Sequence, residues 1–343
     1  MIEENSLSHN QRNSSSILVD RFGRVHDYLR ISVTDRCNLR CTYCMPAEGL
    51  KWKKSEQLLN NDEIVRVARV MAEMGVRKIR LTGGEPTTRP DLADLVARLV
   101  EIEGIDTVSL TTNGVLFARN AQLLKQAGLS GVNISLDSLN RETFKKIARR
   151  DALNHVLGSI EAALQYEFEP VKLNMVVMAG VNEHEMLDFV ELAKANPVNV
   201  RFIEYMPFKG NQWDPTGVVS YAMMRERIEQ TYALHAMPNT FIANRVAEDF
   251  MIPGFCGKIS FIASMSRSFC ATCSRLRLTA DGALKACLFF PAQAQLRESL
   301  RSRATDALLK LEIMRAVFAK PEGHPAPAEL TALNDLSMIE IGG

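Results

Sequence analysis

The feature that most constrains the fold is a repeating unit, in which a short apolar run of strand type precedes a longer segment of helical period. Six such units follow one another between Tyr28 and about residue 205. The predicted strands are 29–33, 78–81, 107–110, 132–136, 171–177 and 200–205. The predicted helices are 62–74, 90–101, 119–127, 141–147, 153–166 and 183–195.

Repeated strand–helix units predict an α/β protein with a parallel sheet. Six units rather than eight predict an incomplete (β/α)6 TIM-like barrel with a lateral mouth. The region after about residue 245 changes character, and we expect it to close that mouth. The chain is therefore divided into a disordered polar tail (1–22), a partial barrel (23–245) and a C-terminal region (246–343).

Composition limits the classes of function. With 41 basic and 40 acidic side chains, the chain has no global field to attract nucleic acid or a membrane surface. It contains no apolar run of transmembrane length, and its first residues lack the pattern of a secretory signal. We therefore expect a cytoplasmic protein that binds neither nucleic acid nor a membrane.

Six of the seven cysteines form two triplets. Cys37, Cys41 and Cys44 lie within eight residues, so one loop can bring the three thiols to a common point. The second triplet is Cys270, Cys273 and Cys287, and an Asp281-Gly282 hairpin turn would return Cys287 towards the other two. Three thiolates do not complete a closed four-ligand site, so each triplet leaves a metal position open.

Other polar motifs come directly after predicted strands. Gly83-Gly84-Glu85-Pro86 follows the second strand and Thr111-Thr112-Asn113-Gly114 follows the third. Because the carboxyl ends of parallel strands share one edge, we expect these loops and the first cysteine loop to face one cavity. Glycine at 83 and 84 would let the backbone approach a ligand closely, and Glu85 could meet an ammonium group.

The first cysteine triplet, Tyr43 before its last cysteine, and the Gly-Gly-Glu-Pro motif together resemble the radical S-adenosylmethionine superfamily. This resemblance implies that three cysteines hold a [4Fe–4S] cluster and that the amino and carboxyl groups of S-adenosylmethionine occupy the open iron. An electron then enters the sulfonium and releases a 5′-deoxyadenosyl radical.

From about residue 25 onward the chain is more specifically similar to the GTP 3′,8-cyclase family of molybdenum cofactor biosynthesis. The motifs that carry this resemblance are 29–37, 79–86, the second triplet with Arg275-Leu276-Arg277, and Gly342-Gly343. It implies a lyase that converts GTP to (8S)-3′,8-cyclo-7,8-dihydroguanosine 5′-triphosphate, after the adenosyl radical abstracts the ribose 3′ hydrogen. A second [4Fe–4S] cluster would bind the purine.

The same resemblance assigns residues to roles. The first cluster takes Cys37, Cys41 and Cys44, and the second takes Cys270, Cys273 and Cys287. S-adenosylmethionine is assigned Tyr43, Gly84, Glu85, Ser135 and Met206. GTP is assigned Arg30, Arg80, Thr111, Lys172, Arg201, Arg275, Leu276 and Arg277. Catalytic roles fall on Arg275, Arg277 and the tail residues Gly342 and Gly343, which would enter the active site.

The resemblance also implies partners: a cyclic pyranopterin monophosphate synthase that uses the product, and an electron donor such as flavodoxin or ferredoxin. The sequence leaves open whether the chain forms a homodimer. Ser274, Met265 and Glu340 depart from the family pattern, which bears on the second-cluster surroundings and on tail packing. Cys256 matches no ligand position and is assigned to packing.

Three other functions are compatible with parts of the pattern. A two-cluster electron carrier would need a fourth cysteine for each cluster. A zinc-bearing structural or nucleic-acid module could recruit His324, the only histidine after Cys287, although it lies far along the chain. A peptide-modifying radical enzyme normally needs more C-terminal cysteines than this chain has.

Overall fold

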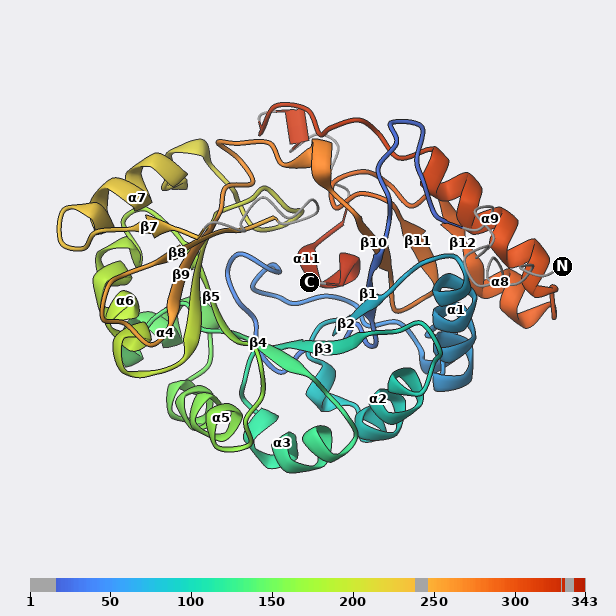
Figure 1. Ribbon diagram of the computed structural model, residues 1–343, viewed down its shortest axis with the longest axis horizontal. Helices are drawn as coiled ribbons and strands as arrows, with labels where there is room; N and C mark the ends of the chain where they lie inside the picture. Colours follow the sequence, from blue (N-terminus) through green and yellow to red (C-terminus); the bar gives the residue numbers. More distant parts are fainter. Residues whose placement is uncertain (1–16, 238–245, 328, 331–335, 343) are drawn as a thin grey trace, which may run out of the picture.

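The computed structural model describes residues 17–237, 246–327, 329–330 and 336–342. Within these residues, twelve strands form one sheet in the order β12-β11-β10-β1-β2-β3-β4-β5-β6-β9-β8-β7 (Figure 1). The strands are β1 (Tyr28–Ser32), β2 (Lys78–Thr82), β3 (Thr107–Thr112), β4 (Gly131–Ser135), β5 (Val171–Val177), β6 (Val198–Glu204), β7 (His235–Ala236), β8 (Glu248–Met251), β9 (Lys258–Ile262), β10 (Arg275–Leu278), β11 (Ala283–Lys285) and β12 (Ala294–Gln295).

The six predicted strand–helix units are confirmed. Strands β1 to β6 lie side by side in chain order, and every neighbouring pair among them is parallel. The helices of these units are α1 (Asn61–Glu73), α2 (Leu92–Val100), α3 (Phe117–Gln126), α4 (Arg141–Ala148), α5 (Leu153–Gln165) and α6 (Met186–Ala195). The remaining helices are α7 (Tyr221–Glu229), α8 (Leu296–Arg301), α9 (Asp306–Phe318) and α11 (Met338–Ile341).

The C-terminal region extends the parallel sheet at both edges. Strand β9 pairs in parallel with β6, and β10 pairs in parallel with β1. Because β9 and β10 are consecutive in the chain, the loop 263–274 between them joins the two outermost strands of the parallel part of the sheet. The barrel stays incomplete, and this loop spans its open side (Figure 1). The expectation that the C-terminal region covers the lateral mouth is therefore met by a loop that carries Cys270 and Cys273.

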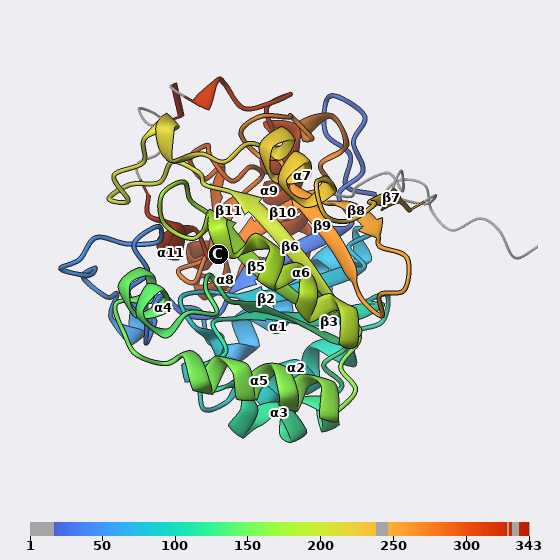
Figure 2. The same cartoon turned by 90° about the vertical axis from the view of Figure 1, so that its left-hand side faces the viewer.

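Helices cover the outer face of the curved sheet, while the strand ends surround a central space (Figures 1 and 2). The apolar periodicity explains this arrangement. Helix α1, for example, buries Ile64, Val67 and Met71 against the sheet, and its Asn60 side chain accepts a hydrogen bond from the Glu63 backbone at 2.9 Å. Local capping and core packing thus agree on where the helix begins and which face it buries.

The predicted hairpin is confirmed. Strands β10 and β11 pair antiparallel, with Arg277 opposite Lys285, and Gly282 in the turn has φ +87°. A positive φ at this position favours glycine because a side chain would be strained there. The hairpin returns the chain towards the second cysteine loop at Cys287.

The predicted polar tail needs a correction at its end. Residues 1–16 lie outside the described part of the chain, but within residues 17–22 the side chains of Leu18 and Asp20 are buried. The Leu18 backbone N–H donates to the Met74 carbonyl at 3.0 Å, and Val19 forms a bridge with Val25. Ile17 and Val19 stay exposed, so Leu18 is the apolar residue of this segment that adds buried surface.

The C-terminal helix α11 lies inside the ring of strands, on the same side as the long loop after β1 (Figures 1 and 2). Ile341 packs in a small second core with Phe208, Phe289 and Leu330, separate from the main core. None of the helices in the described ranges has both the length and the apolar composition needed to cross a membrane.

Candidate active site

One cavity of about 840 Å³ occupies the interior of the partial barrel. Both cysteine triplets line it, as do residues from the ends of β1 to β6, the C-terminal region and helix α11. The two triplets therefore face the same space, although more than half of the chain separates them in sequence. The expectation that the loops after the strands share one cavity agrees with this arrangement.

The first triplet lies in a loop directly after β1. The Cys44 N–H donates to the Cys41 carbonyl at 3.0 Å, so a tight turn brings these two cysteines together. The side-chain amide of Asn113, from the loop after β3, lies 3.7 Å from Cys37 Sγ and donates to Asn38 Oδ1 at 2.7 Å. The neighbouring loop thus helps to fix the position of Cys37.

Burial raises the pKa of the Cys37 thiol to about 12. For Cys44, a hydrogen bond with the Cys41 side chain raises the pKa, and burial adds to the effect. The thiols of Cys37 and Cys44 therefore resist ionisation, which suits a site where bound iron would supply the positive charge that thiolates need. In the described residues, no three His, Cys, Asp or Glu side chains converge on a single metal ion. Ligands to separate irons of a cluster need not converge in that way.

The second triplet has the opposite electrostatic environment. Burial by itself would raise the pKa of Cys273, but the charges of Arg275 and Lys320 outweigh it and lower the pKa to about 6. The buried Lys320 Nζ lies 3.5 Å from Cys273 Sγ and donates to the carbonyls of Cys273 and Arg275 at 3.1 and 3.0 Å. This triplet therefore offers a thiolate next to cations, which also fits an iron–sulfur cluster.

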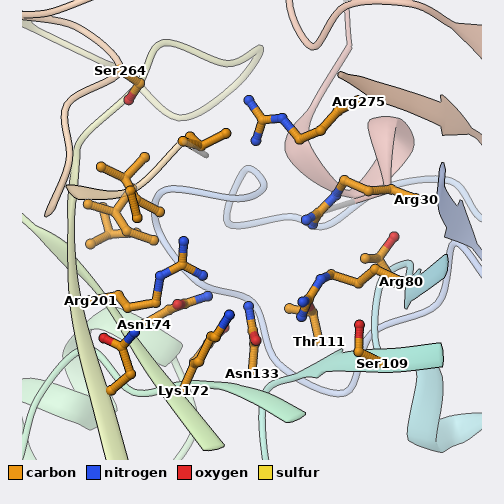
Figure 3. Close-up of a pocket in the computed structure, with 18 of the residues that line it drawn as sticks. Arg30, Arg80, Ser109, Thr111, Asn133, Lys172, Asn174, Arg201, Ser264 and Arg275 are labelled. Carbon is orange, nitrogen blue, oxygen red and sulfur yellow. The ribbon is translucent and has the colours of Figure 1, made fainter. Parts of the chain in front are cut away.

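Basic side chains converge in the cavity that both triplets line (Figure 3). They come from adjacent strands in register: Arg277 of β10 lies opposite Arg30 of β1, which lies opposite Arg80 of β2. Across the cavity, Lys172 of β5 and Arg201 of β6 point to the same space (Figure 3). We call these five residues together with Arg275 the cation layer.

Burial and repulsion between like charges lower the pKa values of several residues in the cation layer. Burial lowers the pKa of Arg30 and of Arg201 to about 10 each, and the neighbouring cations add to both effects. Burial, followed by the charges of Arg201 and Arg80, lowers the pKa of Lys172 to about 8. The same cations outweigh burial at Tyr28 and lower its pKa to about 7. A cavity with these properties is suited to an anion.

Several polar atoms on the cavity wall are buried without a hydrogen-bond partner in the described structure. They are Thr111 Oγ1, Asn174 Oδ1, Arg201 Nε, Ser264 Oγ and His324 Nε2. Buried polar atoms are normally paired, and each unpaired one costs free energy. The wall is therefore complementary to a polar, anionic ligand.

Four of the residues assigned to S-adenosylmethionine line the same cavity as the first triplet. They are Tyr43, Gly84, Ser135 and Met206. The Tyr43 hydroxyl donates to Asp137 Oδ2 at 2.7 Å, and burial raises the pKa of Asp137 to about 6. The sequence interpretation did not include Asp137.

The two glycines have a more specific role than the sequence suggested. A Cβ on Gly84 would lie 2.2 Å from the Arg36 carbonyl oxygen, and one on Gly83 would lie 2.5 Å from that of Thr34. The space that a side chain would need is thus filled by the start of the cysteine loop. Glycine is required first for this backbone packing, and Gly84 still lines the cavity.

Glu85 does not line the cavity, although its assignment to S-adenosylmethionine requires a place on the cavity wall. It is fully buried, and its carboxylate accepts hydrogen bonds from Thr112 Oγ1 (2.7 Å), the Asn113 N–H (2.6 Å) and the N–H and hydroxyl of Thr87 (3.0 and 2.6 Å). Burial raises its pKa despite these donors. This geometry favours a positioning role over contact with an ammonium group.

Leu276 is also placed differently from the expectation. Side chains alternate along β10, so Arg275 and Arg277 line the cavity while Leu276 is fully buried in the main core. Cys256, expected to pack in the interior, is exposed. Its backbone is held by a hydrogen bond to the Lys194 carbonyl at the rim of the sheet.

The tail reaches the ends of β1 and β2. Gly342 ends helix α11 with φ +90°, its carbonyl accepts a hydrogen bond from the Thr82 hydroxyl, and a Cβ would lie 2.5 Å from Ser32 Cβ. Met338 and Ile339 line the cavity. Glu340 caps its own helix through Ser337, so its charge is used locally. Gly343 lies outside the described residues.

Sequence reasoning missed several polar residues of the wall, including Ser109, Asn133 and Asn174 (Figure 3). Strand alternation could have found Asn174, because it lies two residues after Lys172 and so shares its face. Ser274, a noted departure, is buried at the second triplet and lines the cavity.

The fold and the cysteine loop after its first strand define a radical S-adenosylmethionine protein. Residues 31–193 match the model of the Radical SAM superfamily, and residues 198–326 match Molybdenum Cofactor Synthesis C. The solved structure of SuiB from Streptococcus suis has the same fold, with a TM-score of 0.59 and 15% identity over 81% of this chain and 65% of that one.

The chain belongs to the GTP 3′,8-cyclase family. It is 44% identical over 330 residues to the mitochondrial GTP 3′,8-cyclase of Arabidopsis thaliana, which covers 96% of this chain and 84% of that protein. It is 49% identical over 329 residues to molybdenum cofactor biosynthesis protein 1 of Mus musculus, of which it spans about half the length (51%).

Proposed function

We propose that this chain is a GTP 3′,8-cyclase, a lyase that makes (8S)-3′,8-cyclo-7,8-dihydroguanosine 5′-triphosphate in the first step of molybdenum cofactor biosynthesis. The observation that carries the proposal is that two cysteine triplets and a cation layer line one cavity. The Arabidopsis relative, which is named for this activity, supports the choice of substrate.

In this proposal Cys37, Cys41 and Cys44 hold one [4Fe–4S] cluster, and Cys270, Cys273 and Cys287 hold the second. When bound at the first cluster, S-adenosylmethionine supplies a 5′-deoxyadenosyl radical that can remove a hydrogen atom from the ribose 3′ carbon. The chain's own contribution is to place both molecules in one closed space.

The cation layer would hold the triphosphate. A nucleoside triphosphate carries about four negative charges, and guanidinium groups pair with phosphate oxygens through two parallel N–H donors. The unpaired Thr111 hydroxyl and Arg201 Nε would complete the contacts. Arg275 and Arg277 extend the layer towards the second triplet, so the base would lie at that end.

Tyr43, Gly84, Ser135 and Met206 would bind S-adenosylmethionine next to the first triplet. Glu85 would act indirectly, by fixing Asn113 beside Cys37. The tail residues Gly342 and Gly343 and the 263–274 loop would keep water out of the cavity, which protects a reactive radical from side reactions.

The rival functions explain less of the site. An electron carrier has no use for a buried cation layer, and a peptide substrate does not need several guanidinium groups in an enclosed cavity. A small polyanion accounts for both features.

Partners remain part of the proposal. The product would pass to a cyclic pyranopterin monophosphate synthase, and a donor such as flavodoxin or ferredoxin would supply electrons. A cytoplasmic location is a prediction of the same kind.

The test is anaerobic incubation of the iron-reconstituted chain with GTP, S-adenosylmethionine and a reductant, followed by mass analysis. We expect 5′-deoxyadenosine together with a cyclised nucleotide. Deoxyadenosine without nucleotide conversion would retain the superfamily chemistry and reject GTP as the substrate.

A further inference from the structure

His324 lies beside the second cysteine triplet although it is far from it in sequence. It lines the cavity with Cys270, Cys273 and Cys287. A Cβ on the preceding residue, Gly323, would lie 3.7 Å from Cys270 Cβ and 4.0 Å from Cys270 Sγ. The chain just before His324 is thus in contact with the cysteine loop.

A buried arginine ties these two segments together. Arg24 Nη1 donates to the carbonyls of Cys270 (2.8 Å) and Glu322 (2.7 Å), and Nη2 donates to the Pro321 carbonyl (2.6 Å). Asp20 holds the same guanidinium through Nε at 2.6 Å. Because one side chain bridges both backbones, the position of His324 relative to the second triplet is well defined.

The imidazole ring is oriented by two contacts. Its Nδ1 lies 2.8 Å from the Pro325 carbonyl oxygen. The ring also packs edge-to-face against the Phe289 ring, with the centroids 5.1 Å apart and an angle of 65° between the ring planes. A carbonyl oxygen only accepts hydrogen bonds, so Nδ1 carries the proton of the neutral ring. Nε2 then presents a lone pair.

Among the residues that the structure describes, nothing donates to that lone pair. His324 Nε2 is buried and makes no hydrogen bond in the described structure. An acceptor removed from water costs free energy until a donor reaches it. A ligand that brings an N–H group to the second-triplet end of the cavity would supply the missing donor.

We propose that His324 Nε2 accepts a hydrogen bond from an N–H group of the purine base of the bound nucleotide, and so helps to select the base. This inference rests on the proposed function, which places the purine at the second triplet. The proposed function assigns the triphosphate to the guanidinium and ammonium groups of the cation layer, so His324 should affect recognition of the base and not of the phosphates.

The experiment compares His324→Phe and His324→Gln with the parent chain, all loaded anaerobically with iron. Phenylalanine keeps the aromatic contact with Phe289 but has no acceptor, whereas a glutamine side-chain oxygen can replace Nε2. We expect His324→Phe to bind GTP about tenfold more weakly, as for loss of one hydrogen bond in a buried site. His324→Gln should recover most of the affinity, and all three proteins should bind inorganic triphosphate equally.

Iron content and the electron paramagnetic resonance spectrum without nucleotide provide a second readout, and both should be the same in the three proteins. Equal GTP affinity in the parent and in His324→Phe would overturn the inference and leave the proposed function intact. Loss of iron from His324→Phe, or an altered spectrum of that variant without nucleotide, would overturn the inference, because it would show that His324 is a ligand of the cluster. Equal weakening of GTP and inorganic triphosphate would indicate a merely structural role. A parent chain that binds inorganic triphosphate but not GTP would reject the proposed function and this inference with it.

Discussion

Arg30 of β1 lies directly opposite Arg277 of β10 in the parallel sheet register, so the first strand of the barrel and the C-terminal region meet at two cations, of which Arg277 is buried and Arg30 half-buried. Burial and the charges of Arg30 and Arg275 lower the pKa of Arg277 well below its usual range. Two like charges at adjacent strand positions are unfavourable unless an anion joins them. We take this pair as the structural basis of triphosphate binding.

Arg277→Ala should therefore weaken GTP binding by about 10- to 100-fold, because a charge-assisted hydrogen bond contributes roughly 1.5–3 kcal/mol. Cleavage of S-adenosylmethionine should change much less, since Arg277 lies at the second triplet. Equilibrium binding and deoxyadenosine formation measure the two effects separately. Arg141→Ala, at an exposed arginine of α4 paired with Asp151, is the control. Unchanged GTP affinity in Arg277→Ala would contradict the assignment.

Lys172 should make GTP binding dependent on pH. Burial and the charges of Arg201 and Arg80 lower its pKa to about 8, whereas Tyr28 and Asp249 act in the opposite direction. A bound triphosphate favours the charged ammonium, so affinity is highest below pH 8 and is lost as the pH rises through that value. For one proton the affinity should fall about tenfold from pH 7 to pH 9.

Tyr28 should add to this dependence, because its pKa is about 7 and its phenolate would repel phosphate. Lys172→Arg keeps the positive charge at pH 9 and should remove the part of the fall in GTP affinity that comes from Lys172. Adding Tyr28→Phe should make GTP affinity nearly constant from pH 7 to pH 9. A double variant with the full tenfold fall would show that neither group is responsible.

Gly342→Ala should impair activity while the barrel stays folded. The alanine Cβ would lie 2.5 Å from Ser32 Cβ at a φ of +90°, so the tail could not keep its place at the ends of β1 and β2. We expect at least about a tenfold loss of turnover, as found when a positioned group is displaced by an ångström. Gly254→Ala is a matched control, since Gly254 has φ +83° but no atom within 4 Å of the added Cβ. Equal effects in both variants would point to backbone strain alone.

Glu85→Gln distinguishes two roles for the carboxylate. As a positioning residue, Glu85 holds Asn113, which contacts Cys37 and Asn38. Removing one acceptor oxygen from this buried network should cost about 1–3 kcal/mol of stability and reduce iron retention at the first triplet. Full iron content with weakened S-adenosylmethionine binding would instead support direct contact with the cofactor.

The sequence predicted the barrel well because each strand and helix has its own apolar period, which local residues determine. It also predicted that the loops after the first three strands face one cavity, since motifs after parallel strands share an edge, whereas the second triplet and the basic residues were placed in that site by the family resemblance. What it could not predict depends on contacts between distant segments. The donors that surround Glu85 come from the loop after β3 as well as from its own turn. His324 lies at the second triplet, where Arg24, from the segment before β1, donates hydrogen bonds to the backbones of both Cys270 and Glu322.

The deviations at Leu276 and Cys256 have simpler causes. The sequence interpretation assigned all three residues of Arg275-Leu276-Arg277 to GTP. Side chains alternate along a strand, so the middle residue, Leu276, points away from the cavity. Cys256 is in a short loop before β9, where Ile252 and Phe255 pack on the main core while the Cys256 side chain stays exposed.

The most direct test of a shared chamber uses GTP with deuterium at the ribose 3′ position. The reconstituted chain is incubated anaerobically with this GTP, S-adenosylmethionine and a reductant, and the 5′-deoxyadenosine is analysed by mass spectrometry. If the nucleotide at the second triplet lies within reach of the 5′-deoxyadenosyl radical that would form at the first triplet, the deuterium appears in the 5′-deoxyadenosine. Deoxyadenosine that forms without deuterium would contradict the account.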